Sequence, residues 1–128
     1  MYRQAADQGY AAAQNDIGWL YENGFGVAQD YAQALIWYQK AANQGLATGQ
    51  NNIGTLYFDG HGVSKDYGQA VSWYRKAADG GNRAAQFNLG YCYETGSGVP
   101  KDLRQARDWM TKAAAAGDDD AKKWLESH

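Results

Sequence analysis

Residues 45–63 read GLATGQNNIGTLYFDGHGV, and similar stretches stand 36 positions before and 36 positions after this one. The same shift brings residues of one type into register along the rest of the chain. The aligned sets are Gly18, Gly54 and Gly90; Tyr21, Tyr57 and Tyr93; Asp30, Asp66 and Asp102; and Trp37, Trp73 and Trp109. A fixed period between about 20 and 50 residues is typical of stacked supersecondary units. The sequence therefore predicts three near-copies of one structural unit.

The first half of each unit is predicted to be an amphipathic helix. In residues 11–23 the apolar and small side chains recur on one arc at helical spacing. Gly24 follows at the point where a left-handed residue would end the helix. The two later copies are residues 47–59 and 83–95. We call these three segments the A helices.

The second half of each unit is predicted to be another helix with a clear start and stop. Asp30 stands three residues before Gln33, which is the pattern of a helix N-cap with its reciprocal partner. Gly45 then provides the stop. We call these segments the B helices, and they are expected over residues 31–44, 67–80 and 103–116.

We expect all 128 residues to form one domain. Three repeats would be preceded by a partial B helix and followed by a capping helix. Glu126 stands where the repeats have Gly18, Gly54 and Gly90, so no further helix needs to pack on that position. The expected boundaries are 1–9 for the partial helix, 10–45, 46–81 and 82–117 for the repeats, and 118–128 for the cap.

The beginning of the sequence falls inside a repeat. Residues 1–8 align with residues 37–44, so we expect that the chain was excised from a longer protein. A partial B helix without its A helix would expose Tyr2 and Ala5 or Ala6. Such an uncapped N-terminal face is expected to favour self-association.

Composition argues against several classes of protein. Apolar residues make up 45% and aromatic residues 14% of the chain, which favours a packed interior. The net charge of -2 offers no excess of Lys or Arg, so no nucleic-acid partner is expected. No apolar run approaches the roughly 18 residues that a membrane span needs, so no membrane insertion is expected. The compartment is undetermined, and a bacterial periplasmic or secreted location stays open if an upstream signal was removed.

The repeated pattern resembles the Sel-one-like repeat (SLR) family, a relative of the tetratricopeptide repeats. The resemblance implies an all-α fold, a right-handed α-solenoid of antiparallel helix pairs whose concave face is lined by the A helices. It also implies an adaptor or scaffold role in protein assemblies, including bacterial ones. A disulfide-stapled branch of the family is associated with penicillin binding, and a single cysteine, Cys92, places this chain outside it. The motif is carried by Ile17-Gly18, Tyr21, Gly24-Phe25-Gly26-Val27, Asp30, Ala34, Trp37-Tyr38 and Lys40-Ala41-Ala42, and by their later counterparts.

The A-helix residues opposite the core arc differ from repeat to repeat, whereas the core arc hardly changes. We therefore expect a non-catalytic interaction module that binds a peptide or protein segment on the concave A-helix face. Aromatic side chains there would supply buried area, and asparagine amides can pair with an extended backbone. The candidate binding residues are Asn15, Trp19, Glu22, Asn51, Asn52, Thr55, Phe58, Phe87, Asn88, Tyr91 and Glu94.

Two alternatives stand beside this interpretation. The curvature of the stack can bury some of these aromatic side chains against the neighbouring repeat, which would make them structural. The same face can also bind a small ligand or a cell-wall glycan, because aromatic rings stack on sugar rings as well as on side chains.

Catalytic and cofactor chemistry find little support in the sequence. The Gly-x-Gly-Val loops follow no strand and precede no Lys-Ser or Lys-Thr, so they are not phosphate loops. His61 and His128 have no second ligand at metal spacing, and Cys92 is expected in the core. Glu22, Asp59 and Glu94 lie about one period apart as exposed carboxylates. We expect no enzyme activity, no metal and no cofactor.

Overall fold

The computed structural model describes residues 10–128, which form seven α-helices and no strand within that range. The helices are α2 (Ala11–Asn23), α3 (Tyr31–Asn43), α4 (Ala47–Asp59), α5 (Tyr67–Asp79), α6 (Arg83–Thr95), α7 (Leu103–Ala115) and α8 (Asp119–Ser127). The A helices are α2, α4 and α6, and the B helices are α3, α5 and α7. The partial B helix expected over residues 1–9, and the face with Tyr2, lie outside the described residues.

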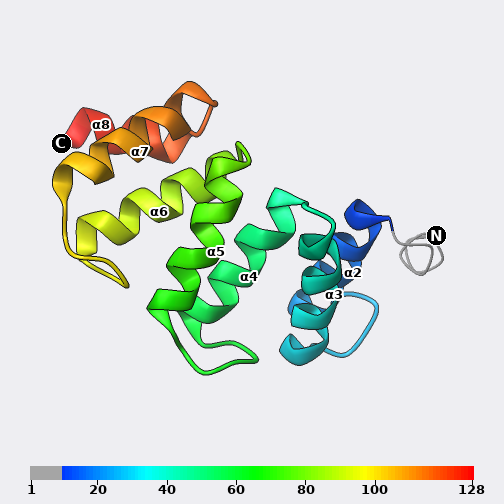
Figure 1. The fold of residues 1–128 in the computed structure, drawn as a ribbon. Helices are drawn as coiled ribbons and strands as arrows, with labels where there is room; N and C mark the ends of the chain where they lie inside the picture. Colours follow the sequence, from blue (N-terminus) through cyan, green and yellow to red (C-terminus); the bar gives the residue numbers. More distant parts are fainter. Residues whose placement is uncertain (1–9) are drawn as a thin grey trace.

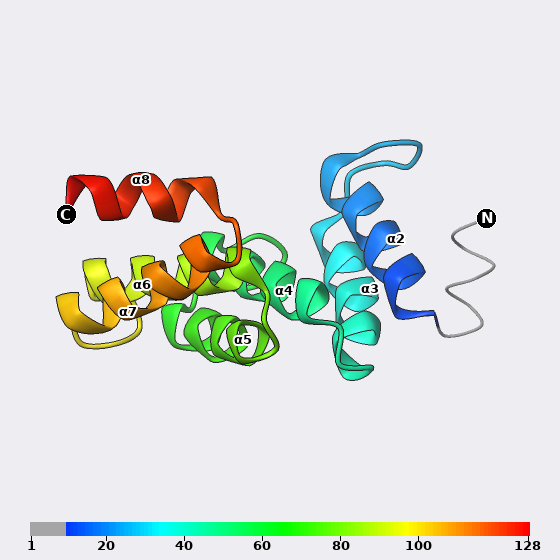
Figure 2. The same cartoon turned by 90° about the horizontal axis from the view of Figure 1, so that it is seen from above.

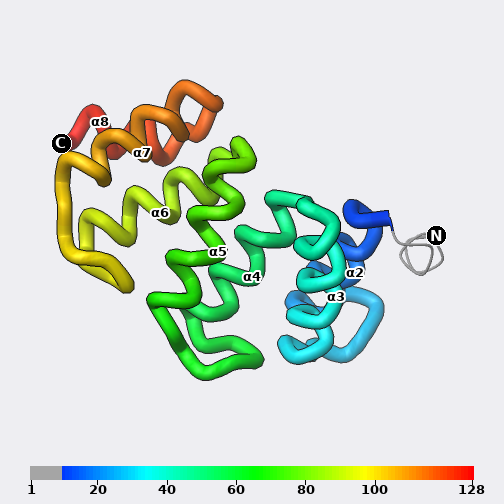
Figure 3. Tube along the Cα trace, in the orientation of Figure 1, coloured from blue at the N-terminus to red at the C-terminus, as the bar shows by residue number. Residues whose placement is uncertain are grey.

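The helices pair in the order of the chain and form the predicted all-α solenoid. Each A helix packs against the B helix that follows it, and each B helix packs against the next A helix. Figure 1 shows the pairs stacked side by side from α2 to α8, and the tube in Figure 3 traces the same path. Viewed from above, successive pairs are turned relative to one another, and α8 runs along the final pair (Figure 2). The main contact partner of α8 is α7.

The aspartate caps of the B helices are as predicted, but the reciprocal bond from the glutamine side chain is not, because the backbone N–H of Asp30 donates to Tyr21 O instead. At the start of each B helix an aspartate side chain accepts a hydrogen bond from the backbone of the third helical residue, Asp30 from Gln33, Asp66 from Gln69 and Asp102 from Gln105. The first B helix ends at Asn43, one residue earlier than expected, with Gln44 as its cap. The backbone N–H groups of Gly45 and Leu46 then bond to Ala42 and Ala41, which is a Schellman motif.

A glycine in each A helix allows the paired B helix to come close. A Cβ atom built on Gly54 would lie 2.7 Å from the ring of Tyr74, and one on Gly18 would lie 2.6 Å from the ring of Tyr38. At Gly90 the facing residue is Met110, whose terminal methyl would be 3.1 Å away. The glycine set is therefore a packing requirement of the hairpin, as the sequence pattern indicated.

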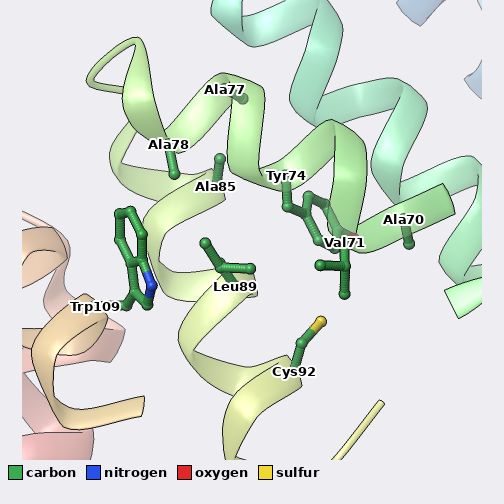
Figure 4. Packing of buried hydrophobic residues seen from close by; sticks show 9 residues of the cluster. All are labelled: Ala70, Val71, Tyr74, Ala77, Ala78, Ala85, Leu89, Cys92 and Trp109. Carbon is green, nitrogen blue, oxygen red and sulfur yellow. The ribbon is translucent and has the colours of Figure 1, made fainter. Parts of the chain in front are cut away.

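The apolar core runs between the helices as a chain of clusters. Figure 4 shows a central cluster in which Tyr74 of α5 and Leu89 and Cys92 of α6 pack together, with Trp109 of α7 closing one side. Leu89 and Cys92 are fully buried. Burial raises the pKa of the Cys92 thiol to about 11, so the thiol stays protonated and uncharged in the core at neutral pH.

Candidate functional site

A pocket of about 270 Å³ opens between the A helices α4 and α6. Phe58 comes from α4, Phe87 and Tyr91 come from α6, and Tyr74 of the B helix α5 reaches between them. The remaining lining residues are Thr55, Asp59 and Asn88. Five predicted binding residues, Thr55, Phe58, Phe87, Asn88 and Tyr91, therefore come together in one pocket.

Aromatic rings make up most of the wall of this pocket. The ring centroid of Phe58 lies 6.5 Å from that of Tyr74 and 6.2 Å from that of Tyr91. Tyr91 is 42% exposed, whereas Tyr74 is buried and Phe58 is half-buried against the core. Phe87 is also half-buried, where it packs on the cluster around Met110. Neighbouring repeats thus cover part of Phe58 and Phe87, as the structural alternative allowed, while Tyr91 presents an open ring.

The hydroxyl of Tyr74 supplies one polar group to this wall. It lies 3.0 Å from Thr55 Oγ1, and either oxygen can be the donor. Burial raises the pKa of Tyr74 well above its usual range. The Thr55 hydrogen bond opposes this rise in pKa, while the thiolate of Cys92, once ionised, and the carboxylate of Asp59 add to it. The phenol therefore stays neutral and keeps its proton for hydrogen bonding.

Tyr74 was not among the predicted binding residues. In the repeated motif it is the counterpart of Tyr38, and its ring is buried in the core. Because Gly54 has no side chain, the ring crosses beside α4 and its hydroxyl reaches Thr55. The signal that could have identified Tyr74 is a glycine in the A helix opposite a long B-helix side chain. Such a side chain can extend beside the glycine and reach the A-helix face.

The asparagines of the A-helix face bond to one another between repeats. Asn52 Nδ2 donates to Asn15 Oδ1 at 2.9 Å, and Asn88 Nδ2 donates to Asn51 Oδ1 at 3.0 Å. Each pair joins residues 37 positions apart, so each links successive A helices. Part of the hydrogen-bonding capacity that the sequence offered to a partner is therefore used within the molecule.

The positions equivalent to the pocket in the first repeat are arranged differently. Glu22 stands where the second repeat has Phe58, and its Oε1 accepts a hydrogen bond from the hydroxyl of Tyr38 at 2.5 Å. Burial raises the pKa of Tyr38 beyond its usual range, and the Glu22 carboxylate raises it further. Trp19 is 49% exposed, and its ring lies 5.2 Å from that of Phe25. These residues lie on the same face but do not line the pocket.

Glu94 is directed toward the capping end of the solenoid. Its Oε2 lies 3.0 Å from Nε2 of His128. His128 also stacks on Trp124 of α8, with ring centroids 4.1 Å apart. Glu94 is therefore separated from the pocket residues with which the sequence grouped it.

Among residues 10–128, no cluster of three or more His, Cys, Asp or Glu side chains is arranged to hold a metal ion. No helix in this part of the chain combines the length and apolar character needed to traverse a bilayer. Cys92 is buried and carries a raised pKa, which is the opposite of what a nucleophilic thiolate requires.

The repeats of this chain are similar to a known protein family and to several solved structures. The family model described as Sel1 repeat matches residues 1–10, 11–46, 47–82 and 83–118. Proteins of this family are generally protein-interaction scaffolds and typically non-catalytic. No curated protein matches the chain.

Three solved structures share the fold. A Sel1 repeat protein from Oxalobacter formigenes is 41% identical, with a TM-score of 0.88 over 99% of this chain and 96% of that one. A protective antigen of uropathogenic Escherichia coli with an SLR fold is 45% identical, with a TM-score of 0.92 over 97% of this chain. This chain spans only 27% of the length of that antigen. The cysteine-rich protein B of Helicobacter pylori is 26% identical, with a TM-score of 0.76 over 94% of this chain and 92% of that one. The repeat matches cover nearly the whole sequence, and the chain belongs to the Sel1 repeat family.

Proposed function

We propose that this chain is a non-catalytic adaptor that binds an extended peptide or protein segment across its A-helix face. The observation that carries the proposal is the aromatic pocket between α4 and α6, which has room for one side chain of a partner. A partner segment would place that side chain among Phe58, Phe87 and Tyr91 and lay its backbone along the half-buried Asn88 and Asn52.

The physical basis is the distribution of apolar and polar groups around the pocket. Buried aromatic side chains at the centre of an interface contribute much of its binding free energy, and a polar rim provides orientation. Here the open ring of Tyr91 and the half-buried ring of Phe58 form the apolar part. Asn88 and Asp59 supply the polar groups. Because Asn88 is already held by Asn51, its amide is oriented before a partner arrives.

The same rings support a second candidate ligand, a cell-wall glycan. A sugar ring can stack on Tyr91 while its hydroxyl groups bond to Asp59 and Asn88. Peptides are favoured because the half-buried Asn52 and Asn15 continue the polar surface past the pocket toward α2, which suits an extended chain.

Binding should be measured on the 128-residue chain with a displayed random-peptide library and a glycan array. Selected peptides are expected to bind the unmodified chain and to lose at least about tenfold in affinity with Tyr91→Ala or Phe58→Ala. Tyr10→Ala is the matched control, because Tyr10 is 60% exposed and lies before α2, away from the pocket. Circular dichroism and urea unfolding would establish that each variant is folded.

The outcomes separate the candidates. Peptides that bind all variants equally would contradict the pocket as the anchor. A glycan that binds in the same variant-sensitive way, with no peptide selected, would replace the peptide with the sugar. Loss of binding with Tyr10→Ala but not with Tyr91→Ala would place the binding surface elsewhere.

A further inference from the structure

Charge is divided between the two kinds of helix. The A helices α2, α4 and α6 carry four acidic residues, and their only basic residue is Arg83 at the first position of α6. The acidic residues are Asp16, Glu22, Asp59 and Glu94. The B helices instead carry Lys40, Arg75, Lys76, Arg104, Arg107 and Lys112 against two acids, Asp79 and Asp108. The A-helix face is therefore acidic although the chain as a whole has a net charge of only -2.

The pocket lies on this acidic face and carries one carboxylate. Asp59 lines the pocket and is exposed. Within residues 10–128 it forms no ion pair and its side chain makes no hydrogen bond. No Lys, Arg or His lines the pocket. A bound cation would thus meet a carboxylate whose charge is not already matched.

The pocket rings are also free of internal cations, in contrast to other rings of the molecule. In each repeat a lysine stands over the tryptophan of its own B helix, with Nζ to centroid distances of 4.1 Å for Lys40, 4.6 Å for Lys76 and 4.3 Å for Lys112. Among the described residues, no such cation stands over Phe58, Phe87 or Tyr91. An aromatic face attracts a cation within about 6 Å of its centroid, and several rings around one site strengthen the effect.

We propose that the pocket between α4 and α6 takes the cationic side chain of a lysine or arginine from the bound segment. The rings of Phe58, Phe87 and Tyr91 would surround the aliphatic stem and the cation, and Asp59 would pair with the charge. Asp16 and Glu22 on the same face, unlike Glu94 beside His128, extend the same preference to the flanking residues, so the partner is a basic peptide segment. This inference rests on the proposed function, and it names the class of segment that the same pocket recognises.

The test uses peptides selected from the random library on the unmodified chain. Selection is expected to enrich Lys or Arg at one position. Replacing that residue with norleucine, which keeps the aliphatic stem and removes the charge, should weaken binding about tenfold. Asp59→Asn should weaken the same peptide by about threefold to tenfold, with no effect on the norleucine peptide.

Asp108→Asn is the control for overall charge. It removes one exposed negative charge from the B helix α7, which contributes no residue to the pocket, and is expected to change affinity by less than about twofold at physiological salt, where screening acts over about 8 Å. Equal losses for Asp59→Asn and Asp108→Asn would mean general attraction and would overturn the specific pairing.

The result also distinguishes this inference from the proposed function. Enrichment of Leu, Phe or other apolar residues, with affinity still dependent on Tyr91, would retain the peptide groove and reject the cation. Tighter binding of the norleucine peptide would lead to the same conclusion. A library that returns no peptide dependent on Phe58 or Tyr91 would contradict both proposals.

Discussion

Equivalent sequence positions form the interval between α2 and α4 and the interval between α4 and α6. The side-chain contacts in these two intervals nevertheless differ. In the first, Glu22 accepts a hydrogen bond from the hydroxyl of Tyr38. In the second, Phe58 replaces the glutamate and the hydroxyl of Tyr74 meets Thr55 instead. The backbone frame, the glycine and the tyrosine are shared. The comparison teaches that a few substitutions on the variable face, Glu22 against Phe58 among them, together decide whether the B-helix tyrosine is held by a carboxylate or lines an aromatic pocket.

The largest expected effect concerns the glycine that both intervals share. Gly54→Ala should lower the free energy of unfolding by about 2 kcal/mol, because the new methyl group would lie 2.7 Å from the rigid ring of Tyr74. Gly90→Ala should cost less than about 1 kcal/mol, because the flexible end of Met110 can move and alanine favours the helix. Urea unfolding of both variants measures the difference, and equal losses would show that the facing side chain is irrelevant.

The next effect distinguishes the two tyrosine hydroxyls. Tyr38→Phe should cost about 1.5 kcal/mol, because it removes a hydrogen bond to a carboxylate, whereas Tyr74→Phe removes a bond between neutral groups and should cost about 0.5 kcal/mol. Thermal and urea unfolding would be compared under identical conditions. A larger loss of unfolding free energy for Tyr74→Phe than for Tyr38→Phe would show that the bond to Thr55 is the stronger of the two.

The asparagine pairs should differ in the same measurement, but by less. A double-mutant cycle to alanine should give a coupling free energy of about 1 kcal/mol for Asn51 with Asn88, because Asn51 is only 9% exposed. The half-buried Asn15–Asn52 pair should give about 0.5 kcal/mol. The cycle cancels the helix preference of alanine. Zero coupling for both pairs would show that the bonds do not tie the A helices together.

The smallest effect at moderately alkaline pH comes from the buried acids. The folded-state pKa of Cys92 is raised to about 11 from a usual value of 9.0, so the folded state holds its proton more tightly than the unfolded state does. The stabilising contribution of the Cys92 proton is therefore complete well below pH 9 and is lost as pH rises toward 11, with a loss of about 0.4 kcal/mol at about pH 9. Cys92→Ala should show a shallower decline. Tyr38 and Tyr74, whose pKa values are also raised, add their losses at higher pH.

The sequence predicted the features that depend on local chemistry or on exact repetition. Helix starts followed from aspartate caps such as Asp66, and the glycine set followed from a packing need that recurs in every hairpin. The sequence predicted the A-helix face as the binding surface, but it did not predict the pocket on that face. Phe58 and Phe87 are 29 residues apart, which is not the repeat period, and they line one pocket only because successive hairpins are rotated. Nothing local to either residue encodes that rotation.

Pair geometry was also beyond the sequence. Glu22 and Glu94 occupy equivalent positions on the variable face, yet one binds the tyrosine of its own hairpin and the other meets His128. The difference arises because Met110 replaces the tyrosine in the third repeat and offers no hydroxyl. Exact repetition therefore predicts the core well, but it does not predict the side-chain contacts on the variable face of each interval.

The packing of each helix mainly on its neighbours in the chain, described for the fold, makes the array behave as a row of coupled links. Within the described residues α8 packs mainly on α7, whereas α4 and α5 each pack on two helices, so amide protons of α4 and α5 should exchange with solvent more slowly than those of α8. The pocket is built mostly on the helices with two neighbours. Fraying of α8 would therefore reach its walls only through Phe87, which packs on the cluster that includes Ala121.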